Sequence, residues 1–375
     1  MQDVPTDQDN VLEDHQGHPP LAVLEVFLKA CVDKGASDLH LTGGHPPTFR
    51  INGALFAEET GQVSDEIIDG IVHALLNPNQ LVVYQDASSI DLGFSSNGER
   101  FRINLFRQRG RTAIAVRHLS NDLLSFTALR LPESLVGLSR LTHGLVLICG
   151  ATGSGKSTTL AAILDEISRN RACHIMTVED PIEFIHEGHL SLVHQRELHS
   201  DVPDFASAVR ASLREDPDVL MVGEMRDIET MRAALTAAET GHLVFSTLHT
   251  GDAVGAIERL VGSFPTGEQD IVRHRIAMIL RAVVAQHLLP AIGGRGRVPA
   301  VEILLVNRAI ANLIENAKTS QIYSTLESSS REGMQTLEQS LVQLVKDRWV
   351  DAESARSRSR DVNAFDSLLG RAQVR

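Results

Sequence analysis

The feature that most constrains this chain is a glycine-rich loop directly after a short apolar run. Residues 145–148 read Leu-Val-Leu-Ile, as expected of a buried parallel strand, and residues 150–157 read Gly-Ala-Thr-Gly-Ser-Gly-Lys-Ser. This spacing is that of a phosphate-binding loop, in which glycines let backbone N–H groups turn onto a polyphosphate. A surface Gly/Ser loop is the alternative. The preceding strand and the apolar residues 160–164 favour the phosphate-binding loop, with a helix beginning near Lys156.

The side chains of this loop predict a nucleotide site. Lys156 would place a positive charge at the β- and γ-phosphates, and the Ser157 hydroxyl could ligate magnesium. We expect Lys156 to face the surface with no packing role. ATP and Mg²⁺ are the predicted cofactors. The predicted nucleotide-binding residues are Gly150, Thr152, Gly153, Ser154, Gly155, Lys156, Ser157 and Thr158.

Length and composition exclude several classes of protein. A chain of 375 residues is long enough for two domains, and its net charge of −13 disfavours a nucleic-acid partner. No apolar run approaches the roughly 18 residues of a membrane span, and the N-terminus is acidic where a signal peptide is basic. The three cysteines are too widely spaced for a disulfide framework or a structural zinc site. We therefore expect a cytoplasmic protein with no transmembrane segment.

Changes of pattern along the chain predict a tail, two domains and a linker. Residues 1–19 lack apolar periodicity and are expected to be a disordered tail. Residues 20–119 begin with a helical pattern and continue with strands, where Asn52-Gly53 and Asn97-Gly98 predict hairpin turns. The weak periodicity of residues 120–132 is typical of a linker.

The second domain is predicted to span residues 133–375. Apolar runs at 145–149, 218–222 and 243–248 alternate there with helical stretches, which is typical of an α/β fold with a mostly parallel sheet flanked by helices. Its last part is helical, and the pattern beyond Asp351 is weak. In such a sheet, functional residues gather at the carboxyl ends of the strands.

Acidic residues and a histidine follow the predicted strands. Glu224 comes after the strand 218–222, and Glu179 follows the apolar residues 175–178. A lone surface glutamate is normally a solvated charge. Transfer of a phosphoryl group to water, however, needs a carboxylate beside the phosphates. Because Glu179 and Glu224 both follow strands of the same predicted domain, we expect them to supply such carboxylates. His249, after the strand 243–248, is a candidate sensor of the γ-phosphate, whereas His242 before it could equally be structural.

Four segments together resemble the secretion and pilus ATPases, and most closely their type IV pilus retraction members. The resemblance runs from about residue 21 to about residue 350, and it implies a PAS-like N-terminal domain, a RecA-like ATPase domain and a hexameric ring with ATP between subunits. The segments, similar to the Walker A, Asp-box, Walker B and His-box motifs, are GATGSGKSTT, TVEDPIEFIH, SLREDPDVLMVGEMRD and TGHLVFSTLHTGDAVGAIERL.

The resemblance also implies roles for single residues. Glu179 would be the general base, and Glu224 the Walker B carboxylate that holds magnesium through water, with Ser157 as a ligand. His249 would sense the nucleotide state. Arg102 and Arg117 match family arginines that reach a nucleotide site; without the family match, they would be expected to be solvent-facing strand residues.

The function implied is a motor that hydrolyses ATP and drives pilin subunits from the fibre back into the inner membrane. Its partners would be other copies of itself in a homohexamer, the inner-membrane platform protein of the pilus machine and, indirectly, pilin. This would make the protein cytoplasmic but peripheral to the membrane. A pilus extension or type II secretion ATPase of the same superfamily is the alternative. The net charge disfavours a DNA-translocating motor. The presence of both acidic clusters disfavours a regulator that binds nucleotide without hydrolysing it.

One segment departs from the family pattern. Retraction ATPases commonly carry AIRNLIRE, whereas residues 309–316 of this chain read AIANLIEN and lack both arginines. We expect the departure to leave hydrolysis intact and to affect the coupling of hydrolysis to retraction.

Overall fold

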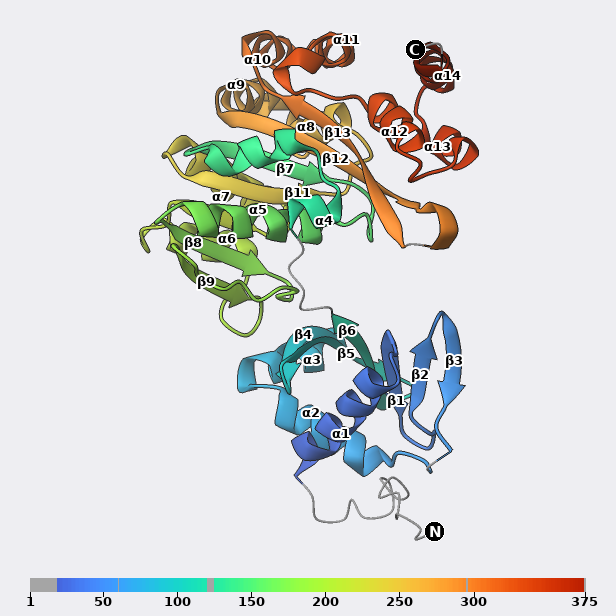
Figure 1. The fold of residues 1–375 in the computed structure, drawn as a ribbon. Coiled ribbons are helices and arrows are strands. Elements are labelled where there is room, and N and C mark those ends of the chain that lie inside the picture. Colours follow the sequence, from blue (N-terminus) through green and yellow to red (C-terminus); the bar gives the residue numbers. More distant parts are fainter. Residues whose placement is uncertain (1–18, 60, 120–124, 295, 374–375) are drawn as a thin grey trace. The chain divides into compact units, whose positions relative to one another are not determined.

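The computed structural model describes residues 19–59, 61–119, 125–294 and 296–373, and the chain divides into two units (Figure 1). The first unit holds the elements α1 to β6 together with Glu179–Ile185 and Arg196–Pro203, and the second holds the rest. Residues 1–18 of the predicted tail and 120–124 of the predicted linker lie outside the described residues.

The first unit contains an antiparallel sheet in the order β3-β2-β1-β6-β5-β4. Apolar residues alternate along its strands, and those that face the core pack against α1 and α2, as Leu39, Ile103 and Val116 do. The elements are α1 (Pro20–Asp33), β1 (Asp38–Thr42), β2 (Thr48–Ile51), β3 (Ala54–Ala57), α2 (Asp65–Leu75), α3 (Pro78–Ala87), β4 (Ser89–Ser96), β5 (Glu99–Gln108) and β6 (Arg111–Leu119).

Both predicted hairpins are confirmed. β2 pairs with β3 and β4 with β5, and the connecting residues have positive φ angles: 50° and 87° at Asn52 and Gly53, and 53° and 81° at Asn97 and Gly98. These conformations match the twist of antiparallel strands. Helix α3 was not predicted, although Asn77 and Gln80 form a capping box at its start.

The second unit is built on a mostly parallel sheet in the order β13-β12-β7-β11-β10-β8-β9, which confirms the predicted α/β class. The strands are β7 (Gly144–Cys149), β8 (His174–Glu179), β9 (Leu192–Glu197), β10 (Val219–Val222), β11 (Leu243–Leu248), β12 (Leu280–Pro290) and β13 (Arg297–Leu305). The helices are α4 (Phe126–Leu129), α5 (Lys156–Asn170), α6 (Phe205–Ser212), α7 (Ile228–Glu239), α8 (Ala253–Gly262), α9 (Gln269–Ile279), α10 (Arg308–Glu315), α11 (Ile322–Ser328), α12 (Leu337–Lys346), α13 (Ala352–Arg358) and α14 (Val362–Gln373).

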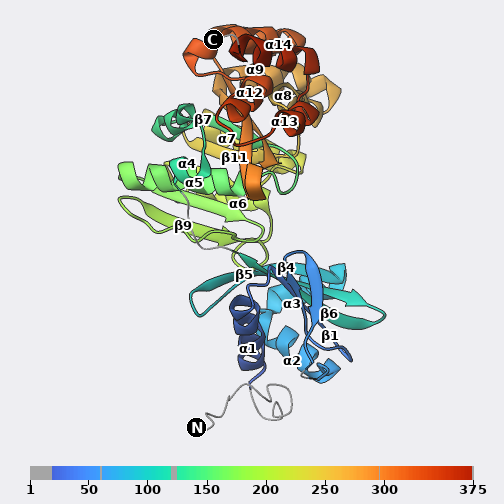
Figure 2. The same cartoon turned by 45° about the vertical axis from the view of Figure 1, so that its right-hand side comes forward.

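Helices lie on both faces of this sheet (Figure 2). Apolar cores lie between the helices and the sheet, because its central strands are buried on both sides. Leu160 and Ile163 of α5 pack on one face with Val146 of β7. Helices α7, α8 and α9 pack on the other face, against residues such as Leu147. The arrangement leaves the carboxyl ends of the strands free to carry loops.

The last helices form a separate cluster at the end of β12 and β13. Phe365 of α14 and Leu341 of α12 are fully buried there beside Leu289 and Val298. Asp351 begins α13 by accepting a hydrogen bond from the Ser354 backbone N–H. Between Ala352 and Gln373, where the sequence pattern is weak, the chain forms the helices α13 and α14. Among the described residues, none of the helices is both long and apolar enough to cross a membrane.

Candidate active site

The order of the strands brings the glycine-rich loop, Glu179, Glu224 and His249 to one edge of the sheet. Strands β7, β11, β10 and β8 are successive parallel neighbours. The glycine-rich loop follows β7, His249 follows β11, and Glu224 comes two residues after β10. Glu179 is the last residue of β8 and is buried. The prediction that these residues follow strand ends is therefore confirmed.

Glycine is required at two positions of the loop. Gly150 and Gly155 have φ angles of 149° and 88°. A Cβ atom at Gly150 would lie 2.5 Å from the carbonyl oxygen of Gln286, and one at Gly155 would lie 2.7 Å from the Gln286 side chain. Strand β12 thus packs directly against the glycine-rich loop, and there is no room for a side chain at either of these two loop positions.

Gln286, on β12, also contacts the glycine-rich loop, although the sequence did not predict it as a site residue. Its side chain is 2% exposed. The Gln286 amide nitrogen donates to the Ser154 carbonyl at 2.8 Å, and its oxygen accepts from the Thr159 hydroxyl at 2.7 Å. Gln286 therefore joins the loop to the first turns of α5. A glutamine inside an otherwise apolar run was the available signal, since a buried amide needs partners.

Lys156 is buried, so the expectation that it faces the surface is wrong. The residue is 8% exposed, and its ammonium donates to the carbonyls of Gly150 and Ala151 at 3.0 and 3.1 Å. The loop curls around the Lys156 side chain. The two carbonyls replace the water molecules that the ammonium group loses on burial.

The hydroxyl groups of the glycine-rich loop differ in their surroundings. The Ser154 hydroxyl is buried and has no hydrogen-bond partner within the described part of the chain. Ser157, in the first turn of α5, is exposed, as are Thr152 and Gly153, and Thr158 is half-buried. The loop therefore contains one unsatisfied buried hydroxyl, that of Ser154, and exposes the residues Thr152 and Ser157 to solvent.

Glu224 and His249 are brought together by neighbouring strands. The Thr247 hydroxyl of β11 donates to the Gly223 carbonyl at 2.6 Å, which fixes the backbone beside Glu224. The Glu224 carboxylate lies 2.7 Å from Nε of Arg226 and 3.5 Å from Nε2 of His249. His242 lies at the opposite end of β11, where its ring contacts the Ala237 carbonyl at 3.0 Å, as expected of a structural histidine.

Arg102 and Arg117 lie in the first unit. Arg102 of β5 is ion-paired with Asp91 at 2.8 Å, and Arg117 of β6 with Asp38 at 2.9 Å. Hydrogen bonding to Asp91 raises the pKa of Arg102 above its ordinary value, against the opposing effect of burial. Both guanidinium groups are partly open to solvent, and both are fixed by carboxylates.

The described residues include no group of three or more His, Cys, Asp or Glu side chains that could hold a metal ion.

Comparison with known proteins identifies the family. The model of the Type II/IV secretion system protein family matches residues 15–356. The chain belongs to this family. It is 43% identical over 328 residues to the type IV pilus retraction ATPase PilT of Pseudomonas aeruginosa, which covers 87% of this chain and 95% of that relative. It is 36% identical to the type IV pilus ATPase PilU of the same species, over 92% of this chain and 91% of PilU.

The fold of this family member also matches a solved structure. The crystal structure of the pilus retraction motor PilT with bound ADP superimposes with a TM-score of 0.83 at 41% sequence identity. The match covers 92% of this chain and 99% of the other.

Proposed function

We propose that this protein is an ATP-hydrolysing motor that powers type IV pilus retraction as a homohexamer. The observation that carries the proposal is that the glycine-rich loop, His249, Glu224 and Glu179 follow four neighbouring strands. Phosphoryl transfer to water needs a phosphate cradle and carboxylates at one place. Similarity to a retraction ATPase along 95% of that relative's length supports the pilus function.

The loop fits a polyphosphate. Gly150, Gly153 and Gly155 have positive φ angles, a conformation in which backbone N–H groups can turn toward an anion. The unsatisfied hydroxyl of Ser154 could take a phosphate oxygen as its partner. Lys156 would exchange the carbonyls of Gly150 and Ala151 for charged phosphate oxygens, which are stronger acceptors.

Mg²⁺ is the proposed cofactor, and it would neutralise charge on the β- and γ-phosphates when bound. Ser157 would be its direct ligand, since the hydroxyl is exposed on the first turn of α5. Glu224 would hold the ion through a water molecule. The contacts of Glu224 with Arg226 and His249 would fix the carboxylate for that role.

We assign the proton transfer to Glu179, which would accept the proton of the attacking water. Its position at the end of β8, next to β10, supports this assignment. His249 would sense the nucleotide state through Glu224, because a shift of that carboxylate changes the charge beside the imidazole. Arg102 and Arg117 would stabilise transition-state charge at the site of an adjacent subunit.

The partners proposed are the inner-membrane platform protein of the pilus machine and, indirectly, pilin. The protein would act in the cytoplasm, held peripherally at the inner membrane by that machine. A net charge of −13 supports a protein partner over nucleic acid. A pilus extension or secretion ATPase would use the same site chemistry, so cell experiments must separate these functions.

Two experiments test the proposal. Purified protein should hydrolyse ATP, and Lys156→Ala should remove that activity; equal rates would refute the assignment of the loop. Deletion of the gene should then leave cells with excess surface pili and no surface motility. Loss of pili instead would indicate an extension motor.

A further inference from the structure

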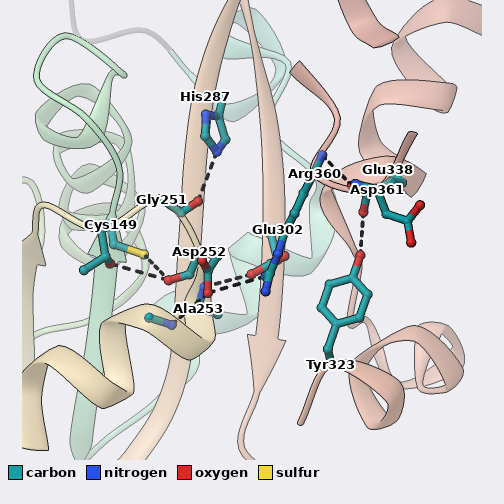
Figure 3. Close-up of polar contacts among 12 residues, drawn as sticks. Cys149, Gly251, Asp252, Ala253, His287, Glu302, Tyr323, Glu338, Arg360 and Asp361 are labelled. Carbon is teal, nitrogen blue, oxygen red and sulfur yellow. Dashed lines mark hydrogen bonds and ion pairs between the residues drawn. The ribbon is translucent and has the colours of Figure 1, made fainter. Parts of the chain in front are cut away.

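The loop that carries His249 is held from two neighbouring strands. The Cys149 thiol, directly before the glycine-rich loop, donates to the Asp252 carbonyl at 3.8 Å. Burial raises the pKa of this thiol to about 12, so it stays a donor. Nε2 of His287 on β12 donates to the Gly251 carbonyl at 3.1 Å. Residues 249–252 are therefore fixed to the strands on which the phosphate-binding loop rests (Figure 3).

Asp252 joins this loop to the C-terminal part of the chain. Its carboxylate begins α8 by accepting from the Gly255 backbone N–H at 2.7 Å. The same oxygen lies 3.5 Å from Nη1 of Arg360, which comes from the turn between α13 and α14. Beside it, the buried Glu302 accepts from the Ala253 backbone N–H at 2.8 Å. The Arg360 side chain thus points toward the carboxyl groups of Asp252 and Glu302 at the start of α8 (Figure 3).

Arg360 is itself held in place by a buried carboxylate. Glu338 of α12 is 1% exposed. One of its oxygens accepts from the backbone N–H groups of Arg360 and Asp361 at 2.9 and 3.0 Å, and the other accepts from the Tyr323 hydroxyl at 2.5 Å. The Arg360 guanidinium lies 5.2 Å from the centre of the Tyr323 ring. Both the backbone and the side chain of Arg360 are therefore oriented.

We propose that Arg360 is a positioning residue for ATP hydrolysis: through Asp252 it fixes the loop that carries His249, and so connects helices α12–α14 with the nucleotide site. This inference rests on the function proposed above. Its physical basis is a continuous set of contacts from Glu338 to Arg360, then Asp252 and the Cys149 thiol beside the phosphate-binding loop. Loss of the Arg360 charge would leave the Asp252 carboxylate without this ion-pair partner, and residues 249–252 would be less ordered.

The test compares three variants of the full-length protein. Arg360→Met keeps much of the side-chain volume without the charge, and Arg360→Lys restores the charge. Arg356→Met is the matched control, because Arg356 lies four residues earlier and pairs only with Asp366 among the contacts described, at 3.0 Å. We expect Arg360→Met to lower kcat between about threefold and thirtyfold while KM for ATP changes less than about twofold. Arg360→Lys should recover most of the activity, and Arg356→Met should match the parent.

A second measurement does not depend on hydrolysis. Hydrogen–deuterium exchange of residues 249–252 should be faster in Arg360→Met than in the parent and in Arg356→Met. Unchanged exchange and unchanged kcat would overturn the positioning role. A parent protein that binds ATP but does not hydrolyse it would overturn the proposed function instead, and the exchange rates would still decide whether Arg360 orders the loop.

Discussion

Arg102 and Arg117 face each other as directly paired residues of β5 and β6. Like charges in this position repel, and two aspartates offset the repulsion: Asp91 of β4 pairs with Arg102, and Asp38 of β1 with Arg117. The result is a row of charges across four strands in the order Asp38, Arg117, Arg102 and Asp91. Burial raises the pKa of Asp38, but hydrogen bonds from Ser37 and Arg117, together with the charges of Arg117 and His40, lower it below its ordinary value, so this carboxylate stays ionised.

The paired arginines lead to the first prediction. Arg102→Ala and Arg117→Ala should each lower ATP turnover at least about tenfold, because each removes positive charge from the transition state. Each change also breaks a partly exposed ion pair, which should cost less than about 1 kcal/mol of folding stability. Turnover and thermal unfolding of the purified proteins measure both effects.

Arg111→Ala provides the control for these two variants, since Arg111 of β6 forms an ion pair of the same kind with Asp65 at 2.9 Å. Its turnover should equal that of the parent. If all three variants lose the same activity, general disturbance of the sheet explains the loss, and the assignment of Arg102 and Arg117 fails.

Glu179→Gln should separate proton transfer from nucleotide binding. The amide keeps the size of the buried side chain but accepts no proton, so turnover should fall about a hundredfold or more. Binding of ATP, measured with a fluorescent analogue, should stay within about threefold of the parent. If turnover is unchanged and Glu224→Gln abolishes it, the general base is Glu224.

Gln286→Leu should loosen the phosphate-binding loop. The change leaves the Ser154 carbonyl and the Thr159 hydroxyl without their partner, and an unsatisfied buried polar group costs about 1–3 kcal/mol. We expect weaker ATP binding and a lower unfolding temperature. Gln343→Leu, the same change at an exposed position of α12, is the comparison, because it spares both hydrogen bonds. Equal ATP affinities in the two variants would contradict the role given to Gln286.

Glu302 should make stability depend on pH. Its pKa is raised to about 7, mainly by burial and also by Asp252 and Glu338, against the lowering effects of the Ala253 N–H and Arg360. Between its unfolded pKa and pH 7 the folded state binds more protons than the unfolded state, so this group makes stability fall as pH rises. This difference in pKa adds about 3 kcal/mol to the free energy of unfolding below the unfolded pKa, and the added stability is lost as pH rises through the folded pKa.

Glu302→Gln should therefore flatten the decrease in unfolding temperature between pH 5 and pH 8. The exposed Glu327→Gln serves as control and should keep the slope of the parent. Identical slopes in the parent and in Glu302→Gln would show that the carboxyl titrates normally.

The segment that departs from the family pattern provides the last prediction. It forms α10, where Glu315 contacts Nδ1 of His274 on α9 at 2.9 Å. Replacing Ala311 and Glu315 with Arg should leave the ATPase rate within about twofold of the parent, because α10 is not one of the segments that follow β7, β8, β10 and β11 and carry the site residues. A twofold change in rate corresponds to a change of under roughly 0.5 kcal/mol in the activation barrier. Retraction in cells that depend on this protein should become stronger.

Ala311→Arg alone keeps the contact between Glu315 and His274, so comparison with the double variant isolates the effect of that contact. A large loss of ATPase activity in either purified variant would mean that α10 serves the nucleotide site directly.

Features that depend on neighbouring residues were determined by the sequence alone. The glycine-rich loop after an apolar strand, the Asn-Gly hairpins at 52–53 and 97–98, and the strand ends that carry Glu224 and His249 all follow from short-range periodicity and turn chemistry. One weak local signal was missed: α3 has little apolar periodicity, and its stability comes from buried residues such as Tyr84. The last part of the chain was expected to be helical, but the separate helices beyond Asp351 were not located, and α14 packs there through buried Phe365.

Only the tertiary structure decided which distant residues meet. Gln286 lies beneath the phosphate-binding loop because β12 pairs with β7 in the sheet. Arg360 reaches Asp252 because the C-terminal helices pack at the ends of β12 and β13. The order of strands and the packing of helices result from burying apolar surface over the whole chain, and no short stretch of sequence contains that information.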